Sequence, residues 1–91
     1  MSDIVIHHPH NKPHDEARSL AEQVAAKLKA EFGLDYHWQG DVLEFQRSGV
    51  SGQLKVAPAE VMVVVKLGFL LSALKPKISS EIHRFLAEKF G

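Results

Sequence analysis

The longest apolar stretch of the chain covers residues 61–74 and is interrupted only by Lys66, Gly68 and Ser72. A membrane-spanning helix needs roughly 17–25 predominantly apolar residues, so this stretch is too short to cross a bilayer, and it carries a charge inside. Its first half is β-branched, and its second half is rich in leucine. This order predicts a buried strand that leads directly, at the glycine, into a short helix over 68–74.

A helical pattern occupies residues 14–32. Its apolar positions follow the i, i+3, i+4, i+7 spacing that places side chains on one face of a helix. These positions are Ala17, Leu20, Ala21, Val24, Ala25, Leu28 and Phe32. Asp15 and Glu16 suit the positive end of the helix dipole, and Gly33 is well placed to close the helix. The pattern predicts an amphipathic helix with its apolar face on a core.

A short strand is predicted before this helix, over residues 3–8, with Ile4 and Ile6 on one face. Pro9 and Pro13 then interrupt regular structure, because each restricts the residue before it. The pattern leaves open whether this strand pairs within its own sheet or with another chain.

Two alternating segments, 34–39 and 42–47, predict a hairpin around a two-residue turn at Gly40-Asp41. The expected cross-strand pairs are Gln39–Val42, Trp38–Leu43, His37–Glu44 and Tyr36–Phe45. In this register the aromatic residues and Leu43 share one face, whereas His37 and Glu44 share the other. The position of the turn and the alternation of apolar residues require the same pairing, which supports the register.

The remaining segments complete an α+β fold. A loop is predicted over 48–52, followed by a strand with Leu54 and Val56 pointing inward and a turn at Pro58. A second helix opens near Pro76. Its apolar stripe is Ile78, Ile82, Phe85, Leu86 and Phe90. We therefore expect one domain over residues 1–91 in the order β-α-β-β-β-β-α, a mainly antiparallel sheet packed with two helices.

Composition excludes several classes of protein. Hydrophobic residues make up 45% of the chain, which is ordinary for a globular domain. Eleven basic residues balance eleven acidic ones, so the basic excess that usually accompanies nucleic-acid binding is missing. Without cysteine, disulfides and thiolate chemistry are excluded. The first residues include an acid and only a three-residue apolar run, so we expect a cytoplasmic protein without a membrane span.

Four histidines, His7, His8, His10 and His14, fall within eight residues and raise the question of a metal site. Zinc takes three or four ligands in a tetrahedral array. The intervening prolines scatter the ring directions, and the first two histidines point to opposite faces of a strand. We favour an exposed strand end over a metal site and expect no metal or cofactor, although binding by this cluster stays open.

Candidates for catalysis are weak. The block Gly49-Val50-Ser51-Gly52 lacks both the full spacing of a nucleophile elbow and its strand-to-helix context. His37 and Glu44 could exchange protons if they lined a pocket, but a solvated cross-strand pair is the plainer interpretation. The aromatic side chains of the hairpin are interpreted as core. We expect no catalytic residues and no enzymatic activity.

A candidate contact surface is formed by Met62, Val64, Phe69 and Leu70. Lys66 indicates that its side of the last strand faces outward, where Met62 and Val64 make the surface less polar than a solvated sheet face. The short helix of this chain or an intermolecular contact could cover that surface, and the pattern decides between neither.

Several blocks along the whole chain resemble one small family. They are His8-Pro9-His10, Glu16-Ala17-Arg18, Phe32-Gly33-Leu34, Trp38-Gln39-Gly40-Asp41, Gly49-Val50-Ser51-Gly52, Leu67-Gly68-Phe69-Leu70-Leu71 and Lys75-Pro76-Lys77-Ile78. In their order they resemble the polyhydroxyalkanoic acid system protein family of bacteria. The resemblance implies a cytoplasmic, granule-associated protein of polyester storage without established catalytic residues. The closing strand–glycine–helix pattern is also distantly similar to START-like helix-grip domains.

These observations lead to one expected function and two alternatives. We expect a small, non-enzymatic accessory or regulatory protein that contacts polyhydroxyalkanoate granules or granule-associated proteins, with a homodimer as a further possibility. The first alternative is a domain that binds an acyl or other hydrophobic ligand between the sheet and the last helix, lined by Trp38 and residues 69–71. The second is an enzyme that uses His37 and Glu44, which we rank last.

Overall fold

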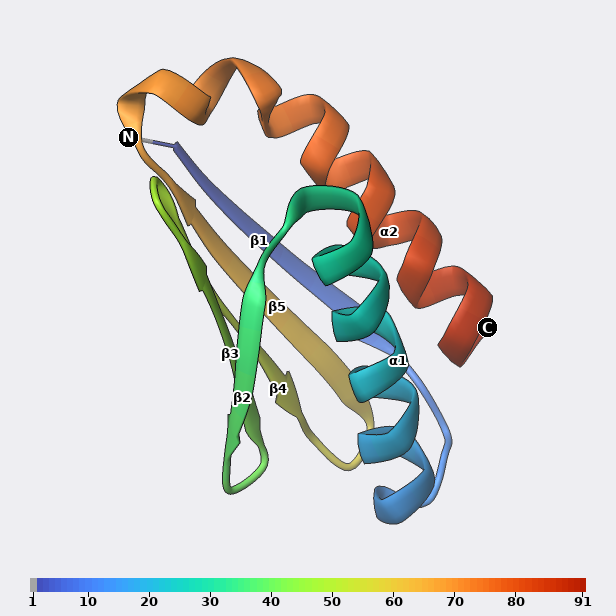
Figure 1. Cartoon of the computed structure of the whole chain (residues 1–91). Helices are drawn as coiled ribbons and strands as arrows, with labels where there is room; N and C mark the ends of the chain where they lie inside the picture. Colours follow the sequence, from blue (N-terminus) through green and yellow to red (C-terminus); the bar gives the residue numbers. More distant parts are fainter. Residues whose placement is uncertain (1) are drawn as a thin grey trace.

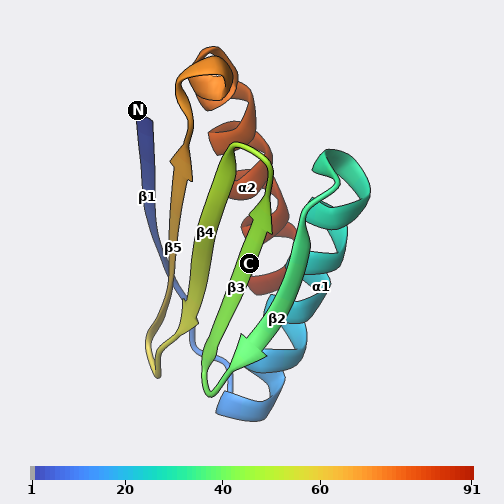
Figure 2. The same ribbon diagram turned by 60° about the vertical axis from the view of Figure 1, so that its left-hand side comes forward.

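The structure is a computed structural model that describes residues 2–91, and it confirms the predicted order of elements (Figure 1). The elements are β1 (Ser2–Pro9), α1 (His14–Phe32), β2 (Asp35–Gln39), β3 (Val42–Arg47), β4 (Val50–Val56), β5 (Glu60–Leu67), the 3₁₀ helix η1 (Phe69–Leu74) and α2 (Lys75–Phe90). The five strands form one antiparallel sheet in the order β1-β5-β4-β3-β2. Both α-helices lie on the same face of this sheet, and the other face carries no helix (Figure 2).

The sheet order follows from the path of the chain. Helix α1 carries the chain from β1 to the far edge of the sheet, and four strands then return in hairpins until β5 lies beside β1. The N-terminal strand therefore pairs within its own sheet, with Ile4 opposite Val65 and Ile6 opposite Val63. This pairing settles the question that the sequence left open.

The predicted hairpin register is confirmed in every pair, from Gln39–Val42 to Tyr36–Phe45. The predicted loop over 48–52 is wrong in its extent, because β4 already begins at Val50 and only Ser48 and Gly49 form the turn. Gly52 lies inside β4. A Cβ atom at this position would lie only 2.7 Å from the carbonyl oxygen of Val64, which is too close for any side chain. A glycine that permits close approach of neighbouring strands was mistaken for a loop residue.

The core lies between the helical layer and the inner face of the sheet. Helix α1 contributes three alanines, Val24 and Leu28, and α2 contributes larger residues that include Ile82 and Phe85. Because the alanines are small, α1 packs closely against both α2 and β4. Full burial of one large apolar side chain stabilises the fold by about 1.5–3 kcal/mol, so these two stripes hold the layers together.

The short helix after Gly68 exists, but it is a 3₁₀ helix without any fully buried residue. It runs directly into α2, where Pro76 occupies the first turn and its missing N–H costs no helical hydrogen bond. Figure 2 shows η1 at one end of the molecule, beyond the ends of the strands. The helix therefore does not cover Met62 and Val64, and this alternative from the sequence is wrong.

Candidate functional site

Helix η1 divides its apolar side chains into two sets. Phe69 and Leu70 are 80% and 88% exposed, whereas Leu71 and the partly exposed Leu74 (45%) line a cavity beneath the helix. In a 3₁₀ helix, side chains three residues apart lie one above the other, which places this second pair on the same side. The Oγ atom of Ser72 donates a 2.9 Å hydrogen bond to the carbonyl oxygen of Phe69 and closes the turn. We call Phe69 and Leu70 the apolar tip.

The base of η1 is fixed to the turn between β3 and β4. The backbone N–H of Gly68 donates a 2.8 Å hydrogen bond to the carbonyl oxygen of Gly49. A Cβ atom on Gly49 would lie 3.0 Å from Cδ1 of Leu71, so the glycine leaves room for that side chain. The base of the apolar tip is therefore fixed by the hydrogen bond from Gly68 and by the packing of Leu71 against Gly49.

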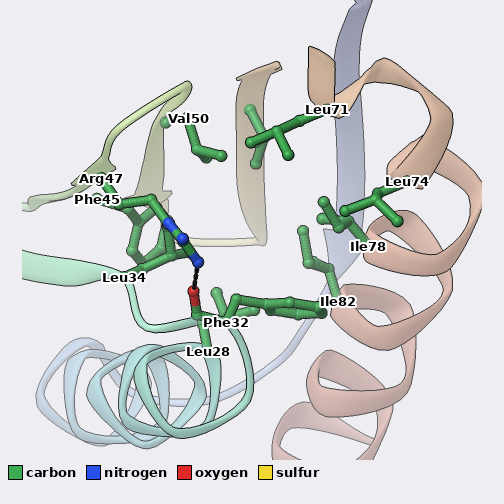
Figure 3. Close-up of a pocket in the computed structure, with 12 residues that line it drawn as sticks. Leu28, Phe32, Leu34, Phe45, Arg47, Val50, Leu71, Leu74, Ile78 and Ile82 are labelled. Atoms are coloured by element: carbon green, nitrogen blue, oxygen red, sulfur yellow. Dashed lines mark hydrogen bonds between the residues drawn. The ribbon is translucent and has the colours of Figure 1, made fainter. Parts of the chain in front are cut away.

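An apolar cavity of about 200 Å³ lies between the sheet and the two helices, under η1 (Figure 3). Its lining comes from every layer of the fold: Leu28, Phe32, Leu34, Phe45, Arg47, Val50, Gly52, Val65, Leu71, Leu74, Ile78 and Ile82. Trp38, Phe69 and Leu70 do not belong to this lining, although the alternative of a ligand-binding domain placed them there. Only Leu71 of the expected set faces the cavity.

Arg47 is the charged side chain of the lining. Its guanidinium donates a hydrogen bond to the carbonyl oxygen of Phe32 at the end of α1 (Figure 3). The last carbonyl groups of a helix have no partner within the helix, and a cation there also complements the helix dipole. The position of Arg47 is thus accounted for by capping of α1.

The uncovered outer face of the sheet carries an apolar strip on its β1–β5 side. Val64 and Met62 lie on this face beside Gln53 and Lys55 of β4, as the sequence predicted, and both are half-buried. Val5 lies opposite Val64 and is 58% exposed. Val5 could not be assigned to this strip from the sequence, because only the pairing of β1 with β5 places it beside Val64.

The four candidate contact residues therefore lie in two places. Met62 and Val64 occupy the outer face of the sheet, whereas Phe69 and Leu70 form the tip at its end. The apolar tip is much the more exposed of the two.

The four histidines near the N-terminus make separate contacts. His7 lies 3.2 Å from Glu60 and His14 lies 3.0 Å from Asp41. The rings of His8 and His10 instead pack against Phe90 at the end of α2, at centroid distances of 6.4 and 5.4 Å. Within residues 2–91, no three side chains of His, Asp or Glu converge as ligands for a metal ion.

His37 and Glu44 lie 3.1 Å apart across the hairpin, and His37 is exposed whereas Glu44 is half-buried. Neither residue lines the apolar cavity, and of the two only Glu44 lines an open hollow on the outer face of the sheet. The geometry matches the solvated cross-strand pair predicted from the sequence.

A polar clasp joins α1 to the β2–β3 hairpin. The guanidinium of Arg18 lies 4.2 Å from the centre of the Trp38 ring, and its Nη1 donates a 2.9 Å hydrogen bond to the carbonyl oxygen of Gly40. The indole N–H of Trp38 donates a 2.9 Å hydrogen bond to Glu22, and Asp41 accepts from Arg18. Trp38 is thus half-buried against the core and serves packing, as predicted.

By its architecture the protein is a two-layer α+β domain, with an antiparallel sheet covered on one face and an apolar tip at its end. Residues 4–90 match the family described as "Putative polyhydroxyalkanoic acid system protein (PHA_gran_rgn)", and the chain belongs to this family. Among proteins of curated function, none matches the chain significantly. No helix among residues 2–91 combines the length and the hydropathy needed to span a membrane.

Proposed function

We propose that this protein is a non-enzymatic accessory protein of polyhydroxyalkanoate storage, which acts in the cytoplasm by contact with the granule surface. Membership of the polyhydroxyalkanoic acid system family supports the link to storage polyester. The observation that carries the proposed mode of action is the apolar tip. Phe69 and Leu70 are exposed to solvent on a helix whose base is hydrogen-bonded to Gly49. Exposed apolar side chains that lie next to each other form the kind of patch that marks an interaction site.

Co-sedimentation of the purified protein with polyester granules tests this proposal. We expect the wild type to bind and the double variant Phe69→Ser/Leu70→Ser to lose most of its binding. The matched control is Met62→Glu/Val64→Lys, which changes the outer face and leaves the tip intact. Circular dichroism must first show that both variants fold. Absence of wild-type binding would contradict the proposal, and binding that only the control variant loses would move the contact to the sheet.

The outer face offers a contact for self-association. Val5, Met62 and Val64 form an apolar strip that two copies of the chain could bury against each other. A stable interface buries about 800 Å² per partner. Light scattering after size exclusion should then give twice the 10.1 kDa mass of one chain, and Met62→Glu/Val64→Lys should give the single mass. A single mass for the wild type at millimolar concentration would exclude this dimer.

The cavity favours a second candidate function, the binding of a short acyl chain. Its lining is almost entirely apolar, which suits a hydrocarbon. Its volume of about 200 Å³ lies below the ~300 Å³ at which drug-sized ligand pockets begin, so only a small ligand would fit. NMR titration with octanoate should shift the methyl signals of Leu71 and Ile82 if this function holds. Shifts confined to surface residues would exclude it.

A further inference from the structure

We infer that the apolar tip and the lysines beside it form a site that inserts into the surface of an anionic phospholipid layer. The lysines are Lys66, Lys75 and Lys77, which we call the lysine collar. This inference deepens the proposed function, because it names the chemistry of the surface that the tip contacts.

The high exposure of Phe69 and Leu70 suits a site that inserts into a lipid layer. Phe69 and Leu70, at 80% and 88%, are far more exposed than Val5 at 58% and Leu74 at 45%, which are the other large apolar side chains exposed among residues 2–91. Figure 2 shows η1 at one end of the molecule, so a flat layer can reach the tip before any strand touches it. Aromatic and leucine side chains bind lipid layers by burying apolar area at the headgroup boundary.

Charge around the tip points to an anionic surface. Residues 61–80 contain the three lysines of the collar and no carboxylate, although the whole chain has zero net charge. All three side chains are exposed, and none takes part in an ion pair within the described part of the chain. Asp3 lies opposite Lys66 in β1, whereas Lys75 and Lys77 start α2 without an acidic residue in its first turn.

The position of Lys75 and Lys77 works against the stability of the helix. The first turn of a helix carries the positive end of the dipole and favours acidic residues, as α1 shows with Asp15 and Glu16. In α2 the first turn carries two lysines instead. The two lysines would therefore gain from an anionic surface brought to this end of the molecule.

The tip is held in its exposed position. Gly68 is hydrogen-bonded to Gly49, Ser72 closes the turn over Phe69, and Leu71 is directed into the cavity. These contacts fix the backbone that carries Phe69 and Leu70. The backbone of the tip therefore loses little conformational entropy on binding, and a small entropy loss favours affinity.

Vesicle sedimentation with the full chain tests the inference. The probes are vesicles of phosphatidylcholine alone and of phosphatidylcholine with an equal share of phosphatidylglycerol. We expect binding to the anionic vesicles, with a loss of affinity of at least roughly tenfold in Lys75→Gln/Lys77→Gln, because each lysine near such a surface contributes about fivefold. The matched control Lys12→Gln/Lys89→Gln removes the same charge elsewhere and should bind like the wild type.

A second measurement locates the inserted residues. The chain has no cysteine, so Leu70→Cys and Val5→Cys each accept one environment-sensitive dye. With anionic vesicles, we expect the emission of the dye at residue 70 to shift to shorter wavelength and that at residue 5 to stay unchanged. Equal responses, or a response at residue 5 only, would overturn the inference.

The outcomes separate this inference from the proposed function. If the wild type binds polyester granules but neither kind of vesicle, the tip contacts bare polyester or a granule protein, and the inference fails while the function stands. If it binds anionic vesicles but not granules, the lipid site stands and the proposed function fails. A third result is equal binding of the wild type to both types of vesicle, with no change in Lys75→Gln/Lys77→Gln. This result would show that the lysine collar does not contribute to binding, and it would overturn the inference.

Discussion

The backbone N–H of Gly68 donates a 2.8 Å hydrogen bond to the carbonyl oxygen of Gly49, and this contact joins the base of η1 to the turn between β3 and β4. Gly49 has a φ of 84°, which side chains rarely tolerate, and a Cβ on Gly68 would lie 3.3 Å from the same carbonyl oxygen. Two sequence blocks that carry the family resemblance thus touch at their glycines. Their role in this fold is close packing beneath the apolar tip.

The first prediction concerns Gly49. Gly49→Ala should destabilise the fold by about 1–2 kcal/mol through backbone strain alone, plus a further cost from crowding of Leu71. Gly40→Ala is the matched control, because Gly40 has a φ of 61° but a Cβ atom there would meet no other atom within 4 Å. Urea unfolding of both variants measures the difference. Equal losses of stability would show that the contact with Leu71 contributes nothing.

The second prediction tests the cavity with two neighbours on β5. Val65 lines the cavity, whereas Val63 is fully buried outside it. Val65→Ile should therefore be neutral or stabilise by up to about 1 kcal/mol, because its extra methylene enters empty space. Val63→Ile adds the same group to a filled region and should cost about 1–3 kcal/mol. Thermal unfolding measures the stability of both variants. If Val65→Ile destabilises the fold as much as Val63→Ile, the space beside Val65 is not empty and the prediction is wrong.

The third prediction concerns the clasp between α1 and the hairpin. Arg18→Gln should reduce stability by about 1–2 kcal/mol, because it removes the stacking on Trp38 and charged hydrogen bonds to the hairpin turn. Fluorescence of Trp38, the single tryptophan, should change in the folded state as well. Arg84→Gln is the control, since both contacts of Arg84, the pair with Glu81 and the Phe85 ring 5.2 Å away, lie within α2 and link it to no other element. This substitution should change stability by less than about 0.5 kcal/mol. A similar effect of both substitutions would reject the clasp.

The fourth prediction concerns the proton on His10. Its Nε2 donates a 2.8 Å hydrogen bond to the carbonyl oxygen of Ala57, and its Nδ1 accepts a 3.0 Å hydrogen bond from the N–H of Lys12. Neutral His10 must therefore carry its proton on Nε2, which long-range ¹⁵N NMR can read directly. His10→Ala should cost about 1–2 kcal/mol, whereas His7→Ala should cost less than about 0.5 kcal/mol. A proton on Nδ1 would contradict this arrangement.

The fifth prediction concerns the pair that links α1 to α2. Lys27 donates a 2.9 Å hydrogen bond to Glu88 and lowers the pKa of that carboxyl below its ordinary value. A lowered pKa in the folded state means that the pair stabilises the fold above the unfolded pKa and that this contribution is lost as the pH falls through the folded pKa. Lys27→Met should raise the pKa of Glu88, as measured by carboxyl ¹³C NMR titration. An unchanged titration would show that the pair is absent in solution.

The hairpin and α1 could be predicted from the sequence because local rules determine them. The turn at Gly40-Asp41 sets the register of the hairpin, and the period of the apolar residues sets the buried face of α1. The outward direction of Met62 and Val64 followed in the same way from the strand alternation around Lys66. In each case the deciding neighbours lie within a few residues along the chain.

Other features depend on residues that are distant in the sequence. The loop over 48–52 was predicted too long because the reason for Gly52 lies in the carbonyl oxygen of Val64, on the next strand. The sequence assigns Phe69 and Leu70 to a contact surface and, in the alternative function, residues 69–71 to a ligand space. The division of the apolar side chains of η1 into an exposed pair and a cavity-lining pair depends on 3₁₀ geometry, which the local sequence does not distinguish from an α-helix.

The sequence by itself determined the element order, the apolar faces of the strands and of the two α-helices, and the family, because periodicity, turn chemistry and ordered motifs are local properties of the chain. Tertiary structure alone decided that β1 pairs with β5, that η1 stands at the end of the sheet and that Phe69 and Leu70 remain in solvent. The physical reason is that exposure depends on which distant segments pack together. The contact of Gly68 with Gly49 fixes that arrangement and leaves the tip uncovered.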